Sequence, residues 1–391
     1  MNYKKLISFD LARKLIISES EIKTKKTKRN LVASINLKSA QTIRSPINLP
    51  EAMIAGLDGY IFHKKSLLDL PISSNLLTPG KKNTKLNLNC AYKINTGSII
   101  PKSFSNFISL ENAVIKNNKI ILKKSKISNK DIKKVGEDLK KNTVLVRKNE
   151  KIDNIKIALL SSVGIKSLWT FNPITVGVFS TGDEIIKLSS KKKLPHQTFD
   201  SNRYQIISFL QKWNVKIHDL GIVKDNEKQI KNLFKKFQNL NLIISSGGSS
   251  FSSGDFVSQY LELNSKIIFK YVKIQPGRPV IFAKNKNQII FSLPGNPLAV
   301  SINLLFLVSM IFNRDLQLHL QKKQCLFEDV KRSKITKFYR VKLQNNKLVP
   351  HNSKGSAKII SLSEADGIAI SNQNQTSINR NDYLDFFKFE K

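Results

Sequence analysis

Apolar and polar residues follow a regular rhythm between residues 173 and 312, which indicates strands that alternate with helices. Four apolar runs have the length of buried strands, at 174–179, 215–222, 241–245 and 289–293. Three segments show the apolar spacing of helices, beginning at Asp200 or Ser201, at 227 and at 298. This alternation predicts an α/β domain whose mostly parallel sheet is covered by helices.

The elements outside this region are shorter and more varied. Helices are expected at Phe9–Ser18 and Lys151–Val163 from their apolar spacing. Short β-type runs separated by Asn, Gly and Pro predict a small β-rich insert in the N-terminal half, at 86–88, 99–100 and 120–122. Short alternating segments after Asn313 predict a small C-terminal β-domain, at 339–343, 348–349, 359–362 and 367–370.

The composition suits a multi-domain globular protein. At 391 residues and 40% hydrophobic content, the chain is long enough for about two to four domains with cores of their own. The most apolar stretch, 300–312, is shorter than the ~20 apolar residues of a spanning helix, so no membrane segment is expected. No apolar signal core follows Lys4 and Lys5, and a cytoplasmic location is expected. Cys90 and Cys325 are distant in sequence and are expected to be reduced.

The formal net charge of +38 raises the question of nucleic-acid binding. The lysines are spread over every segment, with only short clusters such as 23–29 and 191–193, and no zinc finger or basic strand with interleaved aromatic residues is present. We therefore expect no specific nucleic-acid partner, although such a charge favours non-specific polyanion binding and steers anionic small molecules.

The candidate chemistry lies in four turns that follow apolar runs. They are Ser180–Glu184, Ser246–Ser250, Gln275–Pro279 and Pro294–Pro297. In an open α/β sheet such turns lie along the carboxyl edge of the strands, where ligands bind. The turns are therefore expected to form one binding site.

Acidic and glycine residues in these turns suggest a site for metal and phosphate. Asp183, Glu184 and Asp200 follow strand ends, where carboxylates bind Mg²⁺ or ligand hydroxyl groups, or simply cap a turn or helix. Gly247-Gly248 lets backbone amides approach an anion, without the pattern of a P-loop. Asp255, a few residues further on, is a candidate for completing a metal site.

Taken together, the motifs resemble those of the molybdopterin molybdenumtransferases, the family that includes the E domain of gephyrin. The resemblance rests on Thr181-Gly182-Asp183-Glu184, Asp200-Ser201-Asn202-Arg203, Ser245-Ser246-Gly247-Gly248, Pro276-Gly277-Arg278-Pro279 and Leu293-Pro294-Gly295-Asn296-Pro297, in this order. Further similar segments are Leu57-Asp58-Gly59-Tyr60, Thr96-Gly97-Ser98 with Pro101, Gly136-Glu137-Asp138, Phe338-Tyr339-Arg340 and Gly355-Ser356. The resemblance covers essentially the whole chain.

The resemblance implies an elongated homodimer with four domains in each chain. The implied domains are 1–40 with 127–170, a β-rich insert at 41–126, an α/β molybdopterin-binding domain at 171–315 and a C-terminal β-barrel at 316–391. The implied active site lies between the α/β and C-terminal domains of one subunit and the insert of the other.

The implied reaction takes adenylylated molybdopterin and molybdate, leaves molybdenum on the dithiolene and releases AMP, with Mg²⁺ assisting. A molybdopterin adenylyltransferase is the implied upstream partner. The implied catalytic residues are Asp58, Thr96, Asp138, Glu184, Asp200 and Asp255, of which Glu184, Asp200 and Asp255 would hold metal. The implied substrate-binding residues are Ser180, Thr181, Gly182, Asp183, Ser246, Gly247, Gly248, Ser249, Pro276, Gly277, Arg278, Pro294, Gly295, Asn296, Pro297, Arg340 and Ser356.

Two positions depart from the family pattern and keep alternatives open. Gln275 and Tyr271 stand where the family has lysines, and Lys270 and Lys273 are neighbours that would have to compensate. A binding or scaffold protein of the same fold that no longer turns over is therefore a second hypothesis. A third is a relative that uses the α/β domain on another nucleotide-like substrate, such as a competence-damage-type pyrophosphatase, although the segments at Asp58 and Thr96 argue against it.

Overall fold

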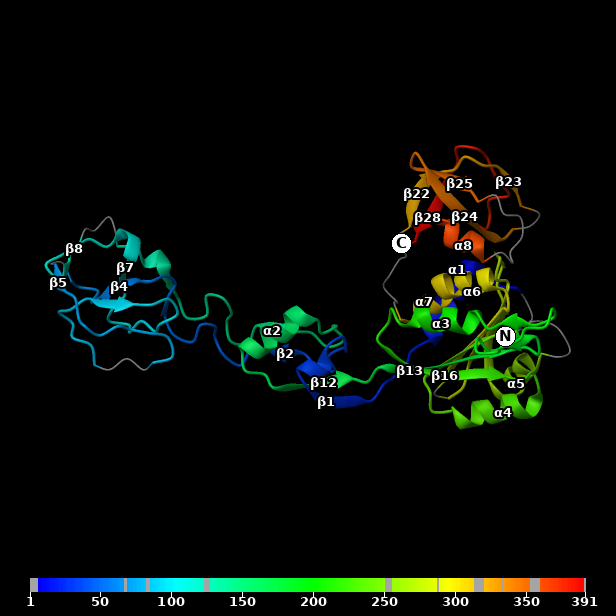
Figure 1. Cartoon of the computed structure of the whole chain (residues 1–391), viewed down its shortest axis with the longest axis horizontal. Helices are drawn as coiled ribbons and strands as arrows, with labels where there is room; N and C mark the ends of the chain where they lie inside the picture. The colour runs from blue at the N-terminus through cyan, green and yellow to red at the C-terminus, as the bar shows by residue number, and fades with distance from the viewer. Residues whose placement is uncertain are drawn as a thin grey trace. The chain divides into compact units, whose positions relative to one another are not determined.

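The structure is a computed structural model, and it describes residues 6–66, 69–81, 85–122, 127–249, 255–286, 288–312, 320–331, 334–351 and 359–389. The chain divides into two compact units (Figure 1). The smaller unit is Lys25–Asn172, and the larger unit combines Met1–Thr24 with Pro173–Lys391. The four predicted domain ranges remain a prediction.

The larger unit contains a six-stranded sheet in the order β16-β13-β17-β21-β20-β18. Its four parallel strands are β16 (Val215–Val223), β13 (Ile174–Thr181), β17 (Leu242–Ser246) and β21 (Ile289–Leu293). They correspond to the four predicted apolar runs, so the mostly parallel α/β fold is confirmed. The sequence did not indicate the two strands at the other edge, β20 (Pro279–Lys284) and β18 (Lys266–Tyr271), where β20 runs antiparallel to both neighbours.

Helices cover both faces of this sheet (Figure 1). One face packs against α1 (Phe9–Glu19), α3 (Asn202–Leu210), α6 (Pro297–Asn303) and α7 (Ser309–Phe312). The other face packs against α4 (Glu227–Lys236) and α5 (Phe256–Asn264). In β17, Leu242 and Ile244 join the first core and Ile243 joins the second, because successive strand residues point to opposite faces. Burial on both faces explains why the runs are apolar without alternation.

The helix predicted from residue 298 is not continuous. A π-helical segment, Leu304–Val308, separates α6 from α7. The segment follows the fully buried Asn303, and Ser309 Oγ donates a hydrogen bond to the Leu305 carbonyl at 2.6 Å. A π-turn inserts one residue without changing the apolar character of a buried helix, so the sequence pattern cannot reveal it.

A second sheet of the larger unit has the order β19-β24-β26-β28-β22. Its strands are β19 (Ile274–Gln275), β24 (Thr336–Gln344), β26 (Gly367–Ile370), β28 (Tyr383–Lys388) and β22 (Gln321–Gln324), and β25 (Lys347–Pro350) also pairs with β24. β23 (Asp329–Val330) and β27 (Ser377–Ile378) form a separate pair. The described strands do not close on themselves, so the expected C-terminal barrel is not confirmed.

One predicted β-segment of this region is wrong. Residues 360–364 form the short helix α8 (Ile360–Glu364) rather than a strand. Ile359 and Ile360 are 51% and 62% exposed, so their apolar character does not mark a buried strand face. The predicted segments at 339–343, 348–349 and 367–370 do lie within strands.

The smaller unit contains several short sheets with separate cores. β1 (Lys26–Asn30) pairs with β12 (Ser167–Phe171), and β2 (Ile43–Arg44) pairs with β11 (Val144–Val146) beside α2 (Asn154–Ser162). The β-rich part contains β3 (Ile54–Ala55), β4 (Gly59–Phe62), β5 (Leu70–Pro71), β6 (Tyr92–Ile94), β7 (Asn106–Ser109), β8 (Ile115–Lys116), β9 (Lys119–Ile120) and β10 (Ile132–Lys133). The described residues of this unit also include 3₁₀ turns at Val32–Ser34, Leu110–Asn112 and Asn129–Asp131. A β-rich region is thus confirmed, although residues 86–88 form no strand.

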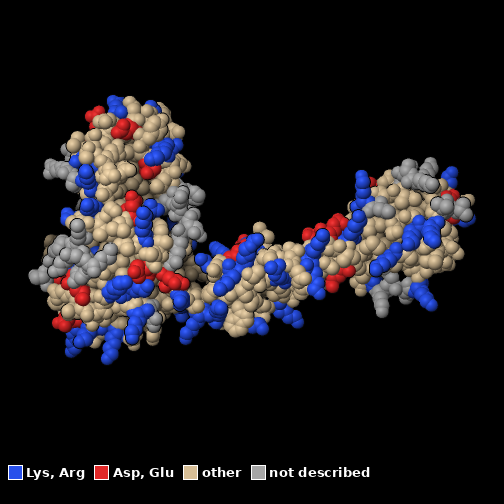
Figure 2. All heavy atoms as spheres, turned by 180° about the vertical axis from the view of Figure 1, so that it is seen from behind, with Lys and Arg blue, Asp and Glu red and all other residues tan. Residues whose placement is uncertain are grey.

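The described helices include no candidate membrane span, and basic side chains are scattered over the face that Figure 2 shows. None of the helices described has both the length and the apolar character to cross a bilayer. Figure 2 shows Lys and Arg side chains scattered over the visible face of each unit, with acidic side chains between them. This distribution agrees with a charge carried on solvated faces.

Candidate functional site

The four turns predicted from the sequence lie along one edge of the six-stranded sheet. The parallel register pairs Ser180 with Ser246 and Ser246 with Leu293, so three turns leave neighbouring strands at the same level. Because β20 is antiparallel to β21, its first residue, Pro279, lies at this same edge, opposite Tyr271 of β18. The edge therefore collects residues from four separate segments of the sequence.

The first turn exposes two carboxylates above a buried base. Ser180 and Thr181 are buried at the end of β13, whereas Asp183 and Glu184 are exposed. Gly182 has φ of +145°, and a Cβ there would approach the Glu184 carboxylate oxygens to 2.8 Å. β14 (Ile185–Ile186) then pairs with β15 (Thr198–Phe199), and this pairing holds the two ends of the intervening loop together.

An acid that the sequence reading missed, Asp225, lies beside this turn. Thr181 Oγ1 donates a hydrogen bond to Asp225 Oδ1 at 3.4 Å, and the Phe256 backbone N–H also donates to it. Burial and the charge of Asp183 raise the pKa of Asp225, and Glu184 adds to the effect. A sequence signal exists, because Asp225 follows the end of β16 by two residues, as Asp183 does β13.

The second turn requires glycine at both central positions. Gly247 has φ of +86°, and a Cβ there would lie 2.3 Å from the Thr181 carbonyl oxygen. Gly248 has φ of +73°, and a Cβ would lie 2.6 Å from Val257 Cβ. The turn is therefore packed directly against the first turn and against α5. Ser246 and Ser249 are buried, and residues 250–254 lie outside the described part of the chain.

Asp255 lies beside the second turn and caps the helix that follows it. It is 3% exposed, and its Oδ1 accepts a hydrogen bond from the Ser258 N–H at 2.8 Å at the start of α5. A Cβ on Gly248 would lie 3.2 Å from the same oxygen. The structure thus places Asp255 next to the Gly-Gly turn, while capping accounts for one of its oxygens.

The Pro294–Pro297 turn caps a helix at one residue and faces open space at another. Asn296 caps α6, since its Oδ1 accepts hydrogen bonds from Leu298 N–H at 3.0 Å and Ala299 N–H at 3.3 Å. Pro297 is the first helical residue, where a missing N–H costs nothing. A Cβ on Gly295 would meet no described atom within 4 Å, so this side of the turn faces open space.

The Gln275–Pro279 turn is anchored to the buried helix α6. Gly277 has φ of +101°, and Asn303 Nδ2 donates a hydrogen bond to its carbonyl at 3.1 Å. Gln275 and Arg278 are exposed. Pro276 is preceded by a cis peptide bond. The turn is therefore held by α6, and Arg278 is exposed to solvent.

The two residues that depart from the family pattern have different surroundings. Tyr271 is 1% exposed, and burial, with the charges of Asp255 and Glu262, raises its pKa to about 12. Its hydroxyl is thus neutral at physiological pH and lies within the electrostatic reach of Asp255 and Arg278. The neighbouring Lys270 forms an ion pair with Glu262.

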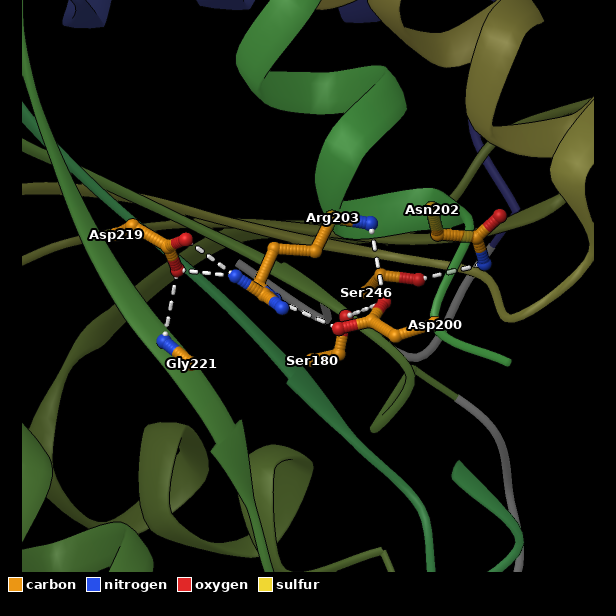
Figure 3. Close-up of polar contacts among 7 residues, drawn as sticks. All are labelled: Ser180, Asp200, Asn202, Arg203, Asp219, Gly221 and Ser246. Carbon is orange, nitrogen blue, oxygen red and sulfur yellow. Dashed lines mark hydrogen bonds and ion pairs between the residues drawn. The ribbon is translucent and has the colours of Figure 1, made fainter. Parts of the chain in front are cut away.

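Asp200 belongs to a buried polar network at the start of α3 (Figure 3). Its Oδ1 accepts hydrogen bonds from Ser180 Oγ at 2.8 Å and from the Arg203 N–H at 3.3 Å, and its Oδ2 pairs with Arg203 Nε at 2.6 Å. Arg203 also forms an ion pair with Asp219. Burial alone would lower the pKa of Arg203, but its bonds to the two carboxylates outweigh burial and raise that pKa.

The carboxylates fit a magnesium ion only in part. Among the described residues, no three His, Cys, Asp or Glu side chains converge to hold a metal ion. Mg²⁺ is usually held by one or two carboxylates together with substrate phosphates, so a complete protein cage is not required. Asp183, Glu184 and Asp225 fit such a role, because their charges already act on one another. Asp200 does not, since Arg203 and Ser180 occupy its oxygens.

In the smaller unit, the structure brings together two of the three predicted residues. Asp58 Oδ1 accepts hydrogen bonds from the Thr96 N–H at 2.7 Å and from Thr96 Oγ1 at 2.8 Å. The backbone bond, followed by the side-chain bond, lowers the pKa of Asp58. Asp138 is exposed in a separate turn, where its N–H donates to the Leu49 carbonyl at 3.1 Å.

The predicted C-terminal residues are only partly described. Arg340 lies on β24, where its Nη1 donates to Ser361 Oγ and burial lowers its pKa. Ser356 lies outside the described residues. The structure therefore places Arg340 on the second sheet of the larger unit and leaves the position of Ser356 undescribed.

Comparison with known proteins agrees with this arrangement. Residues 7–164 match the family described as MoeA N-terminal region (domain I and II), and residues 177–313 match the one described as probable molybdopterin binding domain. A molybdopterin molybdenumtransferase of Haemophilus influenzae is 30% identical over 311 residues, which are 78% of this chain and 76% of the relative. A putative molybdopterin biosynthesis protein of Methanocaldococcus jannaschii is 26% identical over 98% of both chains.

The fold agrees with a solved structure over the full length. The molybdopterin biosynthesis MoeA protein from Pyrococcus horikosii superimposes with a TM-score of 0.83 at 24% identity, covering 99% of this chain and 100% of the other. This likeness supports the fold, and the Haemophilus relative supports the family. The chain belongs to the molybdopterin molybdenumtransferase family.

Proposed function

We propose that this protein transfers molybdenum from molybdate to adenylylated molybdopterin, with cleavage of the phosphoanhydride and release of AMP. The observation that carries the proposal is the gathering of the four turns at one sheet edge. The name of the Haemophilus relative and its coverage of this chain support the same reaction. A cytoplasmic location and a molybdopterin adenylyltransferase that supplies the substrate belong to this proposal.

The turns at the sheet edge would hold the anionic parts of the substrate. Gly247 and Gly248 bring the backbone close to the space above the sheet, where amide groups suit phosphate oxygens. The exposed Arg278 and, on the second sheet, Arg340 supply cationic groups for phosphate or molybdate. The other proposed substrate-binding residues of these turns act by shaping the edge.

Mg²⁺ would be held by Glu184 with one of Asp183 and Asp225, together with phosphate oxygens of the substrate. When bound, it would neutralise negative charge on the phosphoanhydride that is cleaved. The raised pKa of Asp225 supports this placement, because a nearby cation would relieve the repulsion among the carboxylates. Asp255, buried beside the Gly-Gly turn, stays a candidate ligand.

Asp58, Thr96 and Asp138 are proposed to act on the substrate from the second subunit of a homodimer. Thr96 holds Asp58 by two hydrogen bonds and keeps it ionised, so this carboxylate is oriented before substrate arrives. The four-domain division of the chain belongs to the same proposal.

The proposal is tested by mixing the purified protein with adenylylated molybdopterin, Mg²⁺ and molybdate and measuring AMP. We expect molybdate-dependent AMP release together with molybdenum-loaded pterin. Glu184→Gln should slow the release about tenfold or more, in the range for loss of a charged group that acts on phosphoryl transfer. Glu328→Gln, an exposed acid of the C-terminal part, is the matched control and should not change the rate. Absence of AMP release from the unmodified protein would refute the proposal.

A second candidate function is binding of the adenylylated pterin without turnover. Tyr271 and Gln275 favour it, because neither side chain supplies a positive charge at the Gln275–Pro279 turn. Loss of two charge-assisted hydrogen bonds is worth about 1.5–3 kcal/mol each. Tight binding of the substrate without AMP release in the same assay would favour this candidate.

A further inference from the structure

We propose that Asp200, Asn202 and Arg203 are positioning residues that together connect all four parallel strands, at the carboxyl ends of β13, β17 and β21 and within β16, and that Asp200 is not a metal ligand. We call these three residues the α3 brace. The inference deepens the proposed function and rests on it, since the turns that the brace holds are those proposed to bind the adenylylated pterin.

The first contact of the α3 brace is with β13. Asp200 is 2% exposed, and its Oδ1 accepts the hydrogen bond of Ser180 Oγ at 2.8 Å (Figure 3). Ser180 lies next to Thr181, which bonds Asp225 and stands under the Gly247 turn. Asp200 thus holds the end of β13, which directly precedes the exposed Asp183 and Glu184.

The second contact joins β17 and β21 through one carboxamide. Asn202 Nδ2 donates hydrogen bonds to Ser246 Oγ at 2.8 Å and to the Gly295 carbonyl at 2.7 Å. Ser246 begins the Gly-Gly turn, and Gly295 is in the Pro294–Pro297 turn. Both hydrogens of the amide are therefore used to set the distance between two turns. A side chain without two donors cannot make both bonds.

The third contact is with β16. Arg203, whose side chain is 6% exposed, pairs with Asp219, whose side chain is 46% exposed. Asp219 lies where the register between β13 and β16 shifts, and it also accepts a hydrogen bond from the Gly221 N–H at 2.9 Å. Arg203 therefore connects Asp200 to the outermost parallel strand. A planar guanidinium is suited to this role because it donates to two carboxylates in fixed directions.

The same bonds separate Asp200 from the exposed acids of the first turn. Asp200 is 2% exposed and both of its oxygens already accept hydrogen bonds from Arg203 or Ser180, so a metal ion could approach it only if these groups rearranged. Asp183 and Glu184 are exposed to solvent and need no such rearrangement. The function of Asp200 is therefore to place neighbouring groups.

The decisive variants are Asp200→Asn and Asn202→Ala, assayed by AMP release over a range of Mg²⁺ and substrate concentrations. We expect each to lower kcat/KM about tenfold or more, because small misplacements of binding groups are costly. The Mg²⁺ concentration for half-maximal rate should stay within about twofold of the unmodified protein, whereas Glu184→Gln should raise it. Asn232→Ala, on the exposed face of α4, is the matched control and should change neither quantity.

A second measurement does not depend on turnover. In the unmodified protein the Gly247 N–H donates to the Leu293 carbonyl at 3.1 Å, and loss of the α3 brace should speed hydrogen exchange of this amide in Asn202→Ala. Asn202→Ser, which keeps one donor, should give an intermediate rate. If the unmodified protein releases no AMP, the proposed function fails while the exchange result still tests the brace. Unchanged exchange in Asn202→Ala, or a raised Mg²⁺ requirement in Asp200→Asn, would overturn the inference.

Discussion

Asp200 in the larger unit and Asp58 in the smaller unit are both acids of the proposed reaction, yet the chain builds their surroundings in opposite ways. Asp200 is 2% exposed and is held by Arg203, which in turn reaches Asp219 on another strand. Asp58 is exposed, and a single residue, Thr96, supplies both of its hydrogen bonds. The comparison teaches that one acid depends on long-range packing and the other on a local turn.

The two regions also rest on separate cores. The sheet edge of the larger unit lies above cores that contain Ile244 and Phe291 on one face and Ile243 on the other. The turns of Asp58 and Thr96 lie above a core of the smaller unit that contains Ile61 and Phe107. Damage to one core should therefore leave the other acid in place.

The largest expected effect comes from removing a fully buried phenylalanine from each core. Phe291→Ala should lower the unfolding free energy of the larger unit by about 3–5 kcal/mol, and Phe107→Ala should do the same for the smaller unit. The chain has two tryptophans, Trp213 in the larger unit and Trp169 in the smaller. Urea unfolding of a Trp169→Phe background, followed by Trp213 fluorescence, reads the larger unit, and hydrogen exchange of the β4 amides that pair with β7 reads the core that contains Phe107.

The control for this experiment is Leu263→Ala, since Leu263 is 83% exposed and its truncation should change stability by no more than about 0.5 kcal/mol. An equal loss of stability in both measurements, in either phenylalanine variant, would contradict separate cores.

The sequence predicted the parallel strands well but missed the antiparallel ones. The runs of β13, β16, β17 and β21 are apolar and are followed by clear turns, so their periodicity is sufficient. β18 and β20 flank the Gln275–Pro279 turn, and lysines stand at their ends. The two strands pair across the segment that joins them, 272–278, and no local sequence pattern specifies this pairing.

The sequence predicted which turns form the candidate site, but it did not predict what each residue in them does. Asn296 and Asp255 are helix caps in the structure, and capping residues are the same types that bind ligands. Asp225 follows a strand end by two residues, as Asp183 does, but it also directly precedes the cap of α4, so its position is equally typical of an ordinary helix start. The pairing of Arg203 with Asp219 joins a helix to a strand and leaves no sequence pattern, so the role of Asp200 could be seen only in the structure.

A smaller effect compares two glycines with similar backbone angles, one at the sheet edge and one in the smaller unit. Gly247 has φ of +86° and Gly80 has φ of +77°, so alanine at either position costs about 1–2 kcal/mol for the left-handed backbone. Only at Gly247 would the new Cβ meet a neighbour, the Thr181 carbonyl oxygen at 2.3 Å. Gly247→Ala should therefore cost about 1–3 kcal/mol more than Gly80→Ala.

The measurement is again urea unfolding read by Trp213 for Gly247→Ala, and it is hydrogen exchange of the β4 amides for Gly80→Ala, because Leu77 and β4 share one core. Equal costs in the two variants would show that the second turn is not packed against the first, and the contrast between a packed edge and a local turn would then fail.

The smallest effect concerns the hydroxyl of Thr96, and it tests how local the Asp58 site is. Thr96→Val removes the Oγ1 donor and keeps the backbone N–H, which makes the larger contribution to the lowered pKa of Asp58. The pKa of Asp58 should therefore rise in the variant but stay below its ordinary value, as carbon-13 NMR of the carboxyl group can measure.

Because this pKa is lowered on folding, the bonds stabilise the fold above the ordinary Asp pKa of about 3.9, and that stabilisation is lost as pH falls through the folded value. The variant keeps only part of this stabilisation, so it should be less stable than the unmodified protein near neutrality, and the difference should disappear as the pH falls below the folded pKa. Thr42→Val, in the same unit, should leave the titration of Asp58 unchanged, and so should Phe291→Ala if the pair depends on its own turn alone. A shift of the Asp58 pKa in Phe291→Ala would mean that this exposed acid, like Asp200, depends on distant packing.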